Sequence, residues 1–250
     1  MRVNLYDVKI EFDVVKIVIE SRPGRCYQRF TGAGKRSETE IKGRTGSMTN
    51  ESVARAYHHG DLRKALLEAA EAELAEKGVE GFTLRGCAKR AGVSHAAPAH
   101  HFKDANALLT ALAAEGFQRF AAAMSKRQAD ATDARGRLIG AGLGYVDFAL
   151  ANPALFRLMF SSSRPDFGDA ALAEAGSASF EILTRAVRDA CGSDPETDRD
   201  AMLGVAAAWS IVHGLAELLL AGRMPFLTRL AGDDPDAVYA AIIGRIMPAV

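Results

Sequence analysis

The sequence predicts an all-α protein, and three observations carry this prediction. Ala, Leu, Glu and Arg are abundant while aromatic residues are few, and this composition favours helices over strands. From Asp61 onward, apolar residues recur at the spacing of helices that bury one face. After Met48 no segment shows the alternation that is typical of a strand. The length of 250 residues suits one or two domains with a sizeable core.

The first 47 residues differ from the rest of the chain. Residues 1–20 alternate in a β-like way, and residues 21–47 are polar and rich in Gly and Arg, with little to bury. Met48 is a plausible second start codon. We therefore interpret residues 1–47 as an extension upstream of the true start or as a disordered arm, and residues 48–59 as a lead-in. An intact Met1 in mass spectra of the native protein would contradict the first interpretation.

Helices with short connections are expected along the rest of the chain. Apolar residues repeat at every fourth position over 62–74, and Gly78 is the expected C-cap of that helix. Asp104 is the expected N-cap of a long helix, and Asn152-Pro153 ends another because the residue before proline avoids the helical region. The segments GRMPF and GDDPD are expected as turns. We expect the helices at about 61–77, 105–127, 131–151, 154–160, 170–190, 199–221 and 237–246.

The stretch 83–102 predicts two short helices joined by a tight turn. Leu84 and Cys87 share an inward face, and Gly92 can adopt the positive φ that the turn requires. Ser94 is a good N-cap for the second helix. Between residues 83 and 103 there are four Lys or Arg residues and no Asp or Glu. Units of this kind place their second helix in the major groove of DNA, so the sequence predicts a DNA-binding head.

The formal net charge of zero hides a gradient along the chain. Residues 1–59 carry a net charge of +4, residues 60–127 carry +2 and residues 128–250 carry −6. A basic front and an acidic rear suit a protein that meets a polyanion with one end only. The three cysteines are scattered and suggest neither a disulfide framework nor a metal site, so a reducing cytosol is expected. No uninterrupted apolar run reaches the ~18 residues that a membrane helix needs, so we expect no membrane-spanning helix.

With this helix order, the chain resembles the tetracycline-repressor-like (TetR/AcrR) family of bacterial regulators. The resemblance is dense over 60–120 and includes FTLRGCAKRAGVSHAAPAHHF, and Tyr57 to Asp61 also fits one branch of the family. The resemblance implies a DNA-binding domain over 60–120, with its helix-turn-helix at 83–102, and a ligand-binding and dimerisation domain over 121–250. A second set of residues resembles the WHG-type ligand-binding half of that branch: Phe148, Asn152, Pro153, Phe156, Met159, Phe160, Trp209, His213 and Gly214.

A helix-turn-helix uses phosphate contacts to position itself and base contacts to select a sequence. The N-terminus of the second helix is expected to add free N–H groups and a positive dipole end. Exposed histidines can reach base edges, and an alanine can contact a thymine methyl group. We expect Thr83, Arg85 and Lys103 to contact phosphates, and His95, Ala96 and His100 to contact bases. Ser94, at the N-terminus of the second helix, completes the expected DNA-binding residues. Family members usually have a tyrosine at the position of Ala99 and often a lysine at that of Ala105, and both residues grip the DNA backbone.

The second half is expected to bind a small, largely apolar effector and to form a homodimer. Helices 199–221 and 237–246 are the expected dimer interface, because their apolar faces need cover and the family pairs such helices across a two-fold axis. Two heads about one DNA turn (~34 Å) apart imply a palindromic operator. We therefore expect a cytoplasmic, ligand-responsive repressor without a cofactor. The ligand-binding residues implied are Phe148, Phe156, Met159, Phe160, Trp209 and His213.

Simpler interpretations stay open for several of these residues. Arg85, Lys89 and Arg90 could form a solvated helix face, and Trp209 with His213 could be a core pair. The histidines of the first half have no Cys or acidic partner at metal-binding spacing, so no metal site is expected. No nucleophile triad, paired carboxylates or Gly-rich phosphate loop stands out, so an enzyme has little support. Two other classes remain: a small-molecule sensor that has lost DNA binding, and a helical enzyme or cofactor carrier.

Overall fold

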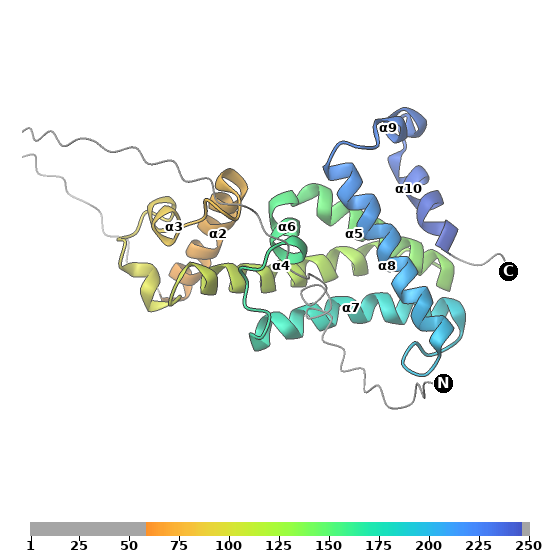
Figure 1. The fold of residues 1–250 in the computed structure, drawn as a ribbon, viewed down its shortest axis with the longest axis horizontal. Coiled ribbons are helices and arrows are strands. Elements are labelled where there is room, and N and C mark those ends of the chain that lie inside the picture. Colours follow the sequence, from red (N-terminus) through yellow and green to blue (C-terminus); the bar gives the residue numbers. More distant parts are fainter. Residues whose placement is uncertain (1–58, 247–250) are drawn as a thin grey trace, which may run out of the picture.

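The computed structural model describes residues 59–246, and these residues form helices without a strand, as predicted (Figure 1). The predictions for residues 1–47 and for most of the lead-in lie outside the described residues. The elements are α2 (His59–Lys77), α3 (Leu84–Arg90), η2 (Ala97–His100), α4 (Ala105–Gln128), α5 (Ala134–Ala151), α6 (Pro153–Ser161), α7 (Ala170–Cys191), α8 (Arg199–Leu220), α9 (Pro225–Ala231), α10 (Pro235–Ile243) and η3 (Gly244–Ile246).

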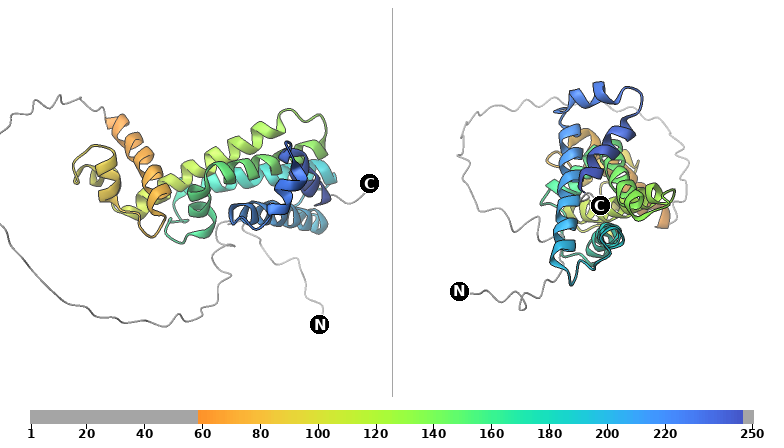
Figure 2. Two further views of the ribbon diagram at one scale, coloured as in Figure 1. Left: turned by 90° about the horizontal axis from the view of Figure 1, so that it is seen from above. Right: turned by 90° about the vertical axis from the view of Figure 1, so that its right-hand side faces the viewer.

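The helices are arranged along one long axis. The head, formed by α2, α3 and η2, occupies one end, and α8, α9 and α10 lie at the other end (Figures 1 and 2). The helix α4 begins in the head and continues into the second half, which we call the body, where it packs against α5, α6 and α7. The helix α8 crosses over α5 and α7. One hydrophobic core runs through both halves, from Leu66 of α2 to Leu215 of α8.

Aspartates begin most of the helices of the body. The Asp104 carboxylate accepts a 2.8 Å hydrogen bond from the Ala107 N–H, which confirms the predicted N-cap of α4. The same arrangement at Asp133 makes α5 begin at residue 134, so the expected start at 131 is three residues early. Side-chain oxygens at such positions satisfy N–H groups that have no partner within the helix. The caps therefore set where these helices begin.

Prolines also set helix starts that were not predicted. The helix α9 was not expected, because GRMPF and GDDPD were predicted to be turns; Pro225 and Pro235 instead begin α9 and α10. Proline is favoured at the first helical position because its fixed φ is helical and its missing N–H would have no partner there. The prediction that these two segments are turns throughout is therefore wrong. Between α5 and α6 the break at Asn152-Pro153 is confirmed, and the helix axes bend there by 110°.

Two glycines allow α5 to lie directly against the backbone of α4. A Cβ atom at position 144 would lie 2.5 Å from the Ala123 carbonyl oxygen, and one at position 140 would lie 2.5 Å from the Arg127 carbonyl oxygen. Real Cβ atoms do not come so close, so only glycine fits at these positions. Gly140 and Gly144 are one helical turn apart and face the same neighbour. The contact fixes the distance between the two helices that carry much of the cavity described below.

One described helix, α8, is long and apolar enough to cross a membrane by length and composition alone. Its most apolar 18-residue window has a mean hydropathy of 1.7, and 28% of that window is buried. The bent pair of α5 and α6 would also pass if it counted as one span. Such helices are weak evidence, because core helices of soluble proteins pass the same test. In this fold α8 covers α5 and α7, and its His213 bonds to Tyr145 of α5.

Candidate DNA-binding head and ligand cavity

The first helix of the helix-turn-helix is built as the sequence predicts. Thr83 is the N-cap of α3, and its hydroxyl oxygen accepts a 3.0 Å hydrogen bond from the Gly86 N–H. Cys87 is fully buried in the core. Gly92 has a φ of +69°, which confirms the expected left-handed turn. The cap sets where α3 begins, and Cys87 helps to pack α3 into the core that it shares with α2.

The second helix differs from the prediction. Residues 95 and 96 form a turn, and only Ala97–His100 is helical, as a 3₁₀ turn that begins after Ala96 without a side-chain cap. The predicted N-cap role of Ser94 is therefore wrong. Pro98 explains the difference: it has no N–H to donate to the Ser94 carbonyl, which instead accepts from Ala97 at 3.0 Å. Backbone bonds to the third residue back continue through His101, so the expected α-helical N-terminus with its dipole is absent from this segment.

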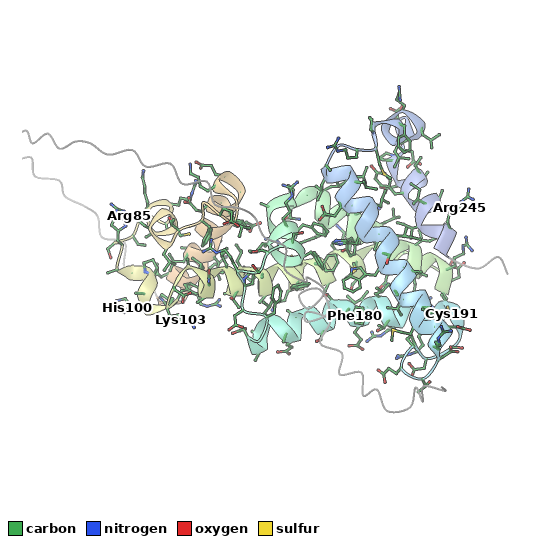
Figure 3. The ribbon with its side chains drawn as sticks, viewed as in Figure 1. Arg85, His100, Lys103, Phe180, Cys191 and Arg245 are labelled. Atoms are coloured by element: carbon green, nitrogen blue, oxygen red, sulfur yellow. The ribbon has the colours of Figure 1, made fainter. Side chains whose placement is uncertain are left out.

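The seven predicted DNA-binding residues are all exposed on the head: Thr83, Arg85, Ser94, His95, Ala96, His100 and Lys103. Figure 3 shows Arg85, His100 and Lys103 at the end of the molecule opposite α8, α9 and α10. The inward residues beside them are Pro98 and Phe102, which are buried. Ala99 is exposed, and Ala105 packs against the core. The structure thus places these residues on the exterior of the head, and their contact with DNA stays a prediction.

Arg90 belongs to a different set of contacts from its neighbours on α3. Its Nε lies 2.5 Å from Glu73 Oε2, and its Nη2 pairs with Glu76; both carboxylates come from α2. These bonds raise the pKa of Arg90. Hydrogen bonds from Lys77 and then from Arg90 lower the pKa of Glu76 to about 2, so it stays ionised. The positive charge of Arg90 is therefore paired with carboxylates inside the head.

Glu73 is nearly buried between α2 and α3, with 6% of its surface exposed. A Cβ atom at position 86 would collide with its carboxylate, so Gly86 makes room for the ion pair. Within the described residues, neither Arg85 nor Lys89 belongs to a salt bridge, and both are exposed. The solvated-face interpretation thus fits Arg85 and Lys89 before DNA is bound, but it does not fit Arg90.

The body contains a cavity lined by uncharged side chains. The cavity has a volume of about 70 Å³. The cavity is therefore narrow. Its walls come from α4, α5, α6, α7, α8, α10 and the loop after α6, and they are Phe117, Phe120, Met124, Leu138, Ala141, Gly142, Tyr145, Met159, Phe160, Ser162, Phe167, Gly176, Ser179, Phe180, Leu183, Ala208, Trp209, Val212 and Ile243.

The main polar feature of the cavity wall is the Tyr145 hydroxyl, which lies 2.7 Å from His213 Nδ1. The hydroxyl can donate to this nitrogen when His213 is neutral and carries its ring proton on Nε2. Burial raises the pKa of Tyr145 and lowers that of His213. Glu217, one turn further along α8, has a buried Oε1 without a hydrogen-bond partner among the described residues. Its negative charge opposes the effect of burial on the pKa of His213.

The predicted ligand-binding residues lie in two layers. Met159, Phe160 and Trp209 line the cavity. Phe148 and Phe156 are buried behind it in a cluster of aromatic side chains. His213 does not line the cavity itself but contacts two residues that do, Tyr145 and Phe160. Tyr145 and two rings of α4, Phe117 and Phe120, were not predicted as ligand-binding residues. Helical spacing shows Phe120 as an apolar position of its helix, but only the packing of α4 on α5 shows that these three residues face a cavity.

Comparisons with known proteins identify the family. Residues 66–112 match the family model for bacterial regulatory proteins of the tetR family, and residues 138–246 match the tetracyclin repressor-like C-terminal domain. A solved protein of unknown function from Rhodococcus sp. RHA1 is 36% identical over 77% of this chain and 96% of its own, with a TM-score of 0.64. The chain belongs to the tetR family of bacterial regulatory proteins. It is therefore a transcriptional regulator with a DNA-binding helix-turn-helix and a ligand-binding half.

Solved structures with lower sequence identity share the fold. The tetR family transcriptional regulator PfmR from Thermus thermophilus is 20% identical, with a TM-score of 0.53 over 72% of this chain and 96% of its own. The transcriptional regulator FadR from Bacillus subtilis, solved in complex with stearoyl-CoA, is 17% identical, with a TM-score of 0.54 over 75% of this chain and 98% of its own. The comparison with curated proteins gave no match. The family resemblance that the sequence suggested is confirmed.

Proposed function

We propose that this tetR-family protein is a cytoplasmic repressor that binds a palindromic operator as a homodimer and releases it when a small, uncharged, largely apolar molecule enters the cavity. The observation that carries the proposal is the separation of two surfaces along α4. An exposed basic surface lies on the head, and a cavity without a charged side chain lies in the body. One continuous helix, α4, begins in the head two residues after Lys103 and lines the cavity further along its length.

The chemistry of the cavity supports an uncharged effector. None of the lining side chains is charged, and the carboxylate of Glu217 lies close enough to affect the pKa of Tyr145. Moving a carboxylate or phosphate ligand into such a site would cost several kcal/mol unless a cation accompanied it. The Tyr145 hydroxyl and the Ser162 and Ser179 side chains supply the few polar groups that could orient a ligand.

Exposed apolar side chains support a homodimer through α8 and α9. Leu203 and Leu218 of α8 are 52% and 41% exposed, and Phe226 and Leu230 of α9 are 52% and 71% exposed. A two-fold axis beside these helices would bury the same residues of both protomers. From the sequence, the interface was expected on 199–221 and 237–246. The exposed side chains favour α9 over the second of these segments.

In the proposed mechanism the ligand changes the spacing between the two heads. With the heads about one DNA turn apart, each head would meet the major groove of one half-site. Ligand binding favours dimers with another spacing, and the shift in DNA affinity equals the difference in ligand affinity between the two states. A coupling of this kind is typically worth about 1–3 kcal/mol, or 5- to 150-fold.

Titration of the full chain against DNA flanking its own gene tests the proposal. We expect sequence-selective binding that weakens as salt rises, because phosphate contacts release counterions. Arg85→Ala should weaken binding to all sequences alike, because Arg85 is expected to contact a phosphate. Arg157→Ala is the matched control, since Arg157 is an exposed arginine of α6 and lies outside the helix-turn-helix. Binding that is neither selective nor salt-sensitive would overturn the proposed regulator.

The same titration addresses a second candidate function, a sensor that has lost DNA binding. Ala99 and Ala105 stand where family members usually carry a tyrosine and often a lysine that grip the DNA backbone, and neither alanine offers a polar side chain. Ligand binding without DNA binding would favour the sensor. A helical enzyme or cofactor carrier has no support from the described residues, and a chromophore or metal in the purified protein would reopen that alternative.

A further inference from the structure

The helix α6 is connected to the head at both of its ends. At its start, Asn152 Oδ1 accepts a 2.5 Å hydrogen bond from Arg119 of α4, whose Nη1 lies 2.7 Å from Glu71 Oε2 of α2. At its end, the chain enters the loop 162–169, which also reaches the head. Figure 1 shows α6 between α2 and the crossing helix α8. Because α6 also lines the cavity, this one short helix contacts both the cavity and α2 of the head.

Arg164 makes the contacts between this loop and the head. Its Nη1 donates a hydrogen bond to the carbonyl oxygen of Val79, in the turn between α2 and α3. Its Nε donates to Asn106 Oδ1 in the first turn of α4 at 3.0 Å, and its guanidinium carbon lies 5.9 Å from the centre of the Phe82 ring. A guanidinium can hold three such groups at once, because it is planar and presents five N–H donors in fixed directions. Arg164 thus joins the α2–α3 turn, the start of α4 and the loop.

The residues around Arg164 form part of the cavity wall. Ser162 and Phe167 line the cavity, and Ser162 Oγ accepts a 3.2 Å hydrogen bond from the Arg164 backbone N–H. The N–H of Asp166 donates to Thr110 Oγ1 of α4 at 2.9 Å. A displacement of this wall therefore reaches the Val79 carbonyl through one side chain, that of Arg164.

Among the walls of the cavity, this loop is the one that can move most easily. The other walls are helices that pack on one another, and their backbones are hydrogen-bonded along their lengths. Inside the loop 162–169, the described backbone–backbone hydrogen bonds reduce to that from the Asp169 N–H to the Asp166 carbonyl. The narrow cavity requires its walls to separate when a ligand enters. Local opening is favoured where backbone bonds and packing are few.

We propose that Arg164 is the positioning residue that couples the cavity to the head: a molecule in the cavity displaces the loop 162–169, and Arg164 then releases the α2–α3 turn. This inference rests on the ligand-responsive function proposed above. The coupling acts on the turn that precedes the N-cap Thr83 of α3, so it changes how the helix-turn-helix is presented. Arg164 touches neither DNA nor ligand in this role.

Hydrogen–deuterium exchange of the full chain, with and without a neutral apolar probe, tests the coupling. N-phenyl-1-naphthylamine is a suitable probe because it carries no charge and absorbs where tryptophan emits. The sequence has one Trp, and it lines the cavity, so quenching of Trp209 reports occupancy. In the native chain we expect the probe to raise exchange several-fold in peptides over 78–83. In Arg164→Gln, exchange over 78–83 should already be raised without the probe. The probe should then quench Trp209 but should not raise this exchange further.

Two other variants separate positioning from general loss of structure. Arg164→Lys keeps a charged donor and should restore part of the response to the probe. Arg157→Gln changes an exposed arginine of α6 that makes none of the described hydrogen bonds or ion pairs, and it should respond like the native chain. If Trp209 quenching shows that the cavity is occupied and the probe changes exchange over 78–83 equally in Arg164→Gln and in the native protein, the proposed coupling is wrong.

A change inside the cavity supplies a test that needs no small molecule. Ala141 lines the cavity from α5 and is 3% exposed, so Ala141→Leu places additional carbon atoms there. We expect it to raise exchange over 78–83 in the native background and not in the Arg164→Gln background. If the probe fails to quench Trp209, the proposed ligand chemistry fails, while this comparison still decides the coupling. Equal changes in both backgrounds would refute the role of Arg164.

Discussion

His213 is a partly buried imidazole whose neutral form suits its hydrogen bond. Its Nδ1 lies 2.7 Å from the Tyr145 hydroxyl, and the tyrosine can donate to it only while that nitrogen is unprotonated. Burial lowers the pKa of His213, and the charge of Glu217 works against that shift. The residue therefore supports the cavity wall through Tyr145, and its contribution to stability depends on pH.

We expect acid to destabilise the folded chain through His213. The unfolded imidazole, with a pKa near ~6.5, takes up a proton before the folded one does, so the stabilising effect is present above that pH and is lost as pH falls toward the lowered folded pKa. Between pH 7.5 and 5.5 the loss is at most about 1.4 kcal/mol, and less because the ring is partly open to solvent. Urea unfolding at both pH values measures it. In His213→Gln this part of the pH dependence should disappear, and an unchanged dependence would contradict the assignment.

At the scale of elements, the pair α4 and α5 depends on a backbone-to-backbone contact. Gly140 and Gly144 sit where any Cβ atom would strike the carbonyl oxygens of α4. Both helices also supply cavity walls, so their separation sets the width of the cavity. The residues that determine this width therefore include glycines that have no side chain in the cavity.

Gly144→Ala should destabilise the protein although alanine is the better helix former. The new methyl group would lie 2.5 Å from the Ala123 carbonyl oxygen and 2.6 Å from Met124 Cα, so α5 must move away from α4. Overpacking of this kind typically costs about 1–3 kcal/mol. Gly204→Ala is the control, because its Cβ would meet the nearest atom at an ordinary 3.4 Å, and it should stabilise by up to about 1 kcal/mol. Denaturant unfolding compares the two, and equal effects would argue against the close contact.

Local signals in the sequence were sufficient for most elements, and their failures have physical causes. Asp104 and the Asn152-Pro153 break act within a few residues, so their consequences could be predicted and are confirmed. At Pro98, in the second helix of the motif, the missing N–H leaves a 3₁₀ turn in place of the predicted α-helix. Pro225 was taken as part of a turn, although the same residue type also starts helices.

The candidate site was less accessible to sequence reasoning than the fold. The exposed residues of the head follow from helical periodicity, which is local. The cavity needs the three-dimensional packing of α4, α5, α7 and α8, and no spacing in the sequence shows that Tyr145 and Trp209 meet. Arg164 lies 58 positions from Asn106 and 85 positions from Val79 in the chain, so no local pattern in the sequence can predict its contacts with them.

For the whole molecule, the proposed dimer can be tested through α8. Leu203 is 52% exposed in the single chain and would be buried against a partner. Leu203→Glu would bury one carboxylate per protomer, and at a few kcal/mol each this should weaken dimerisation by at least about a hundredfold. Leu150→Glu is the control, since Leu150 is 40% exposed at the end of α5, outside the proposed interface. Sedimentation equilibrium should show monomers only for Leu203→Glu, and a native chain that is already monomeric would refute the dimer.

The ion pairs of Arg90 limit how steeply operator binding can depend on salt. With Arg90 held by Glu73 and Glu76, the helix-turn-helix offers Arg85, Lys89 and Lys103 to phosphates, or six cations in a dimer. Each neutralised phosphate contributes about 0.9 to the slope of log K against log salt concentration, so these six account for a slope of about −5. A steeper slope would have to come from cations elsewhere in the chain, or from an Arg90 that exchanges its carboxylates for phosphate. The slope of log K against log salt concentration thus reports whether Arg90 stays paired with its carboxylates when the protein binds DNA.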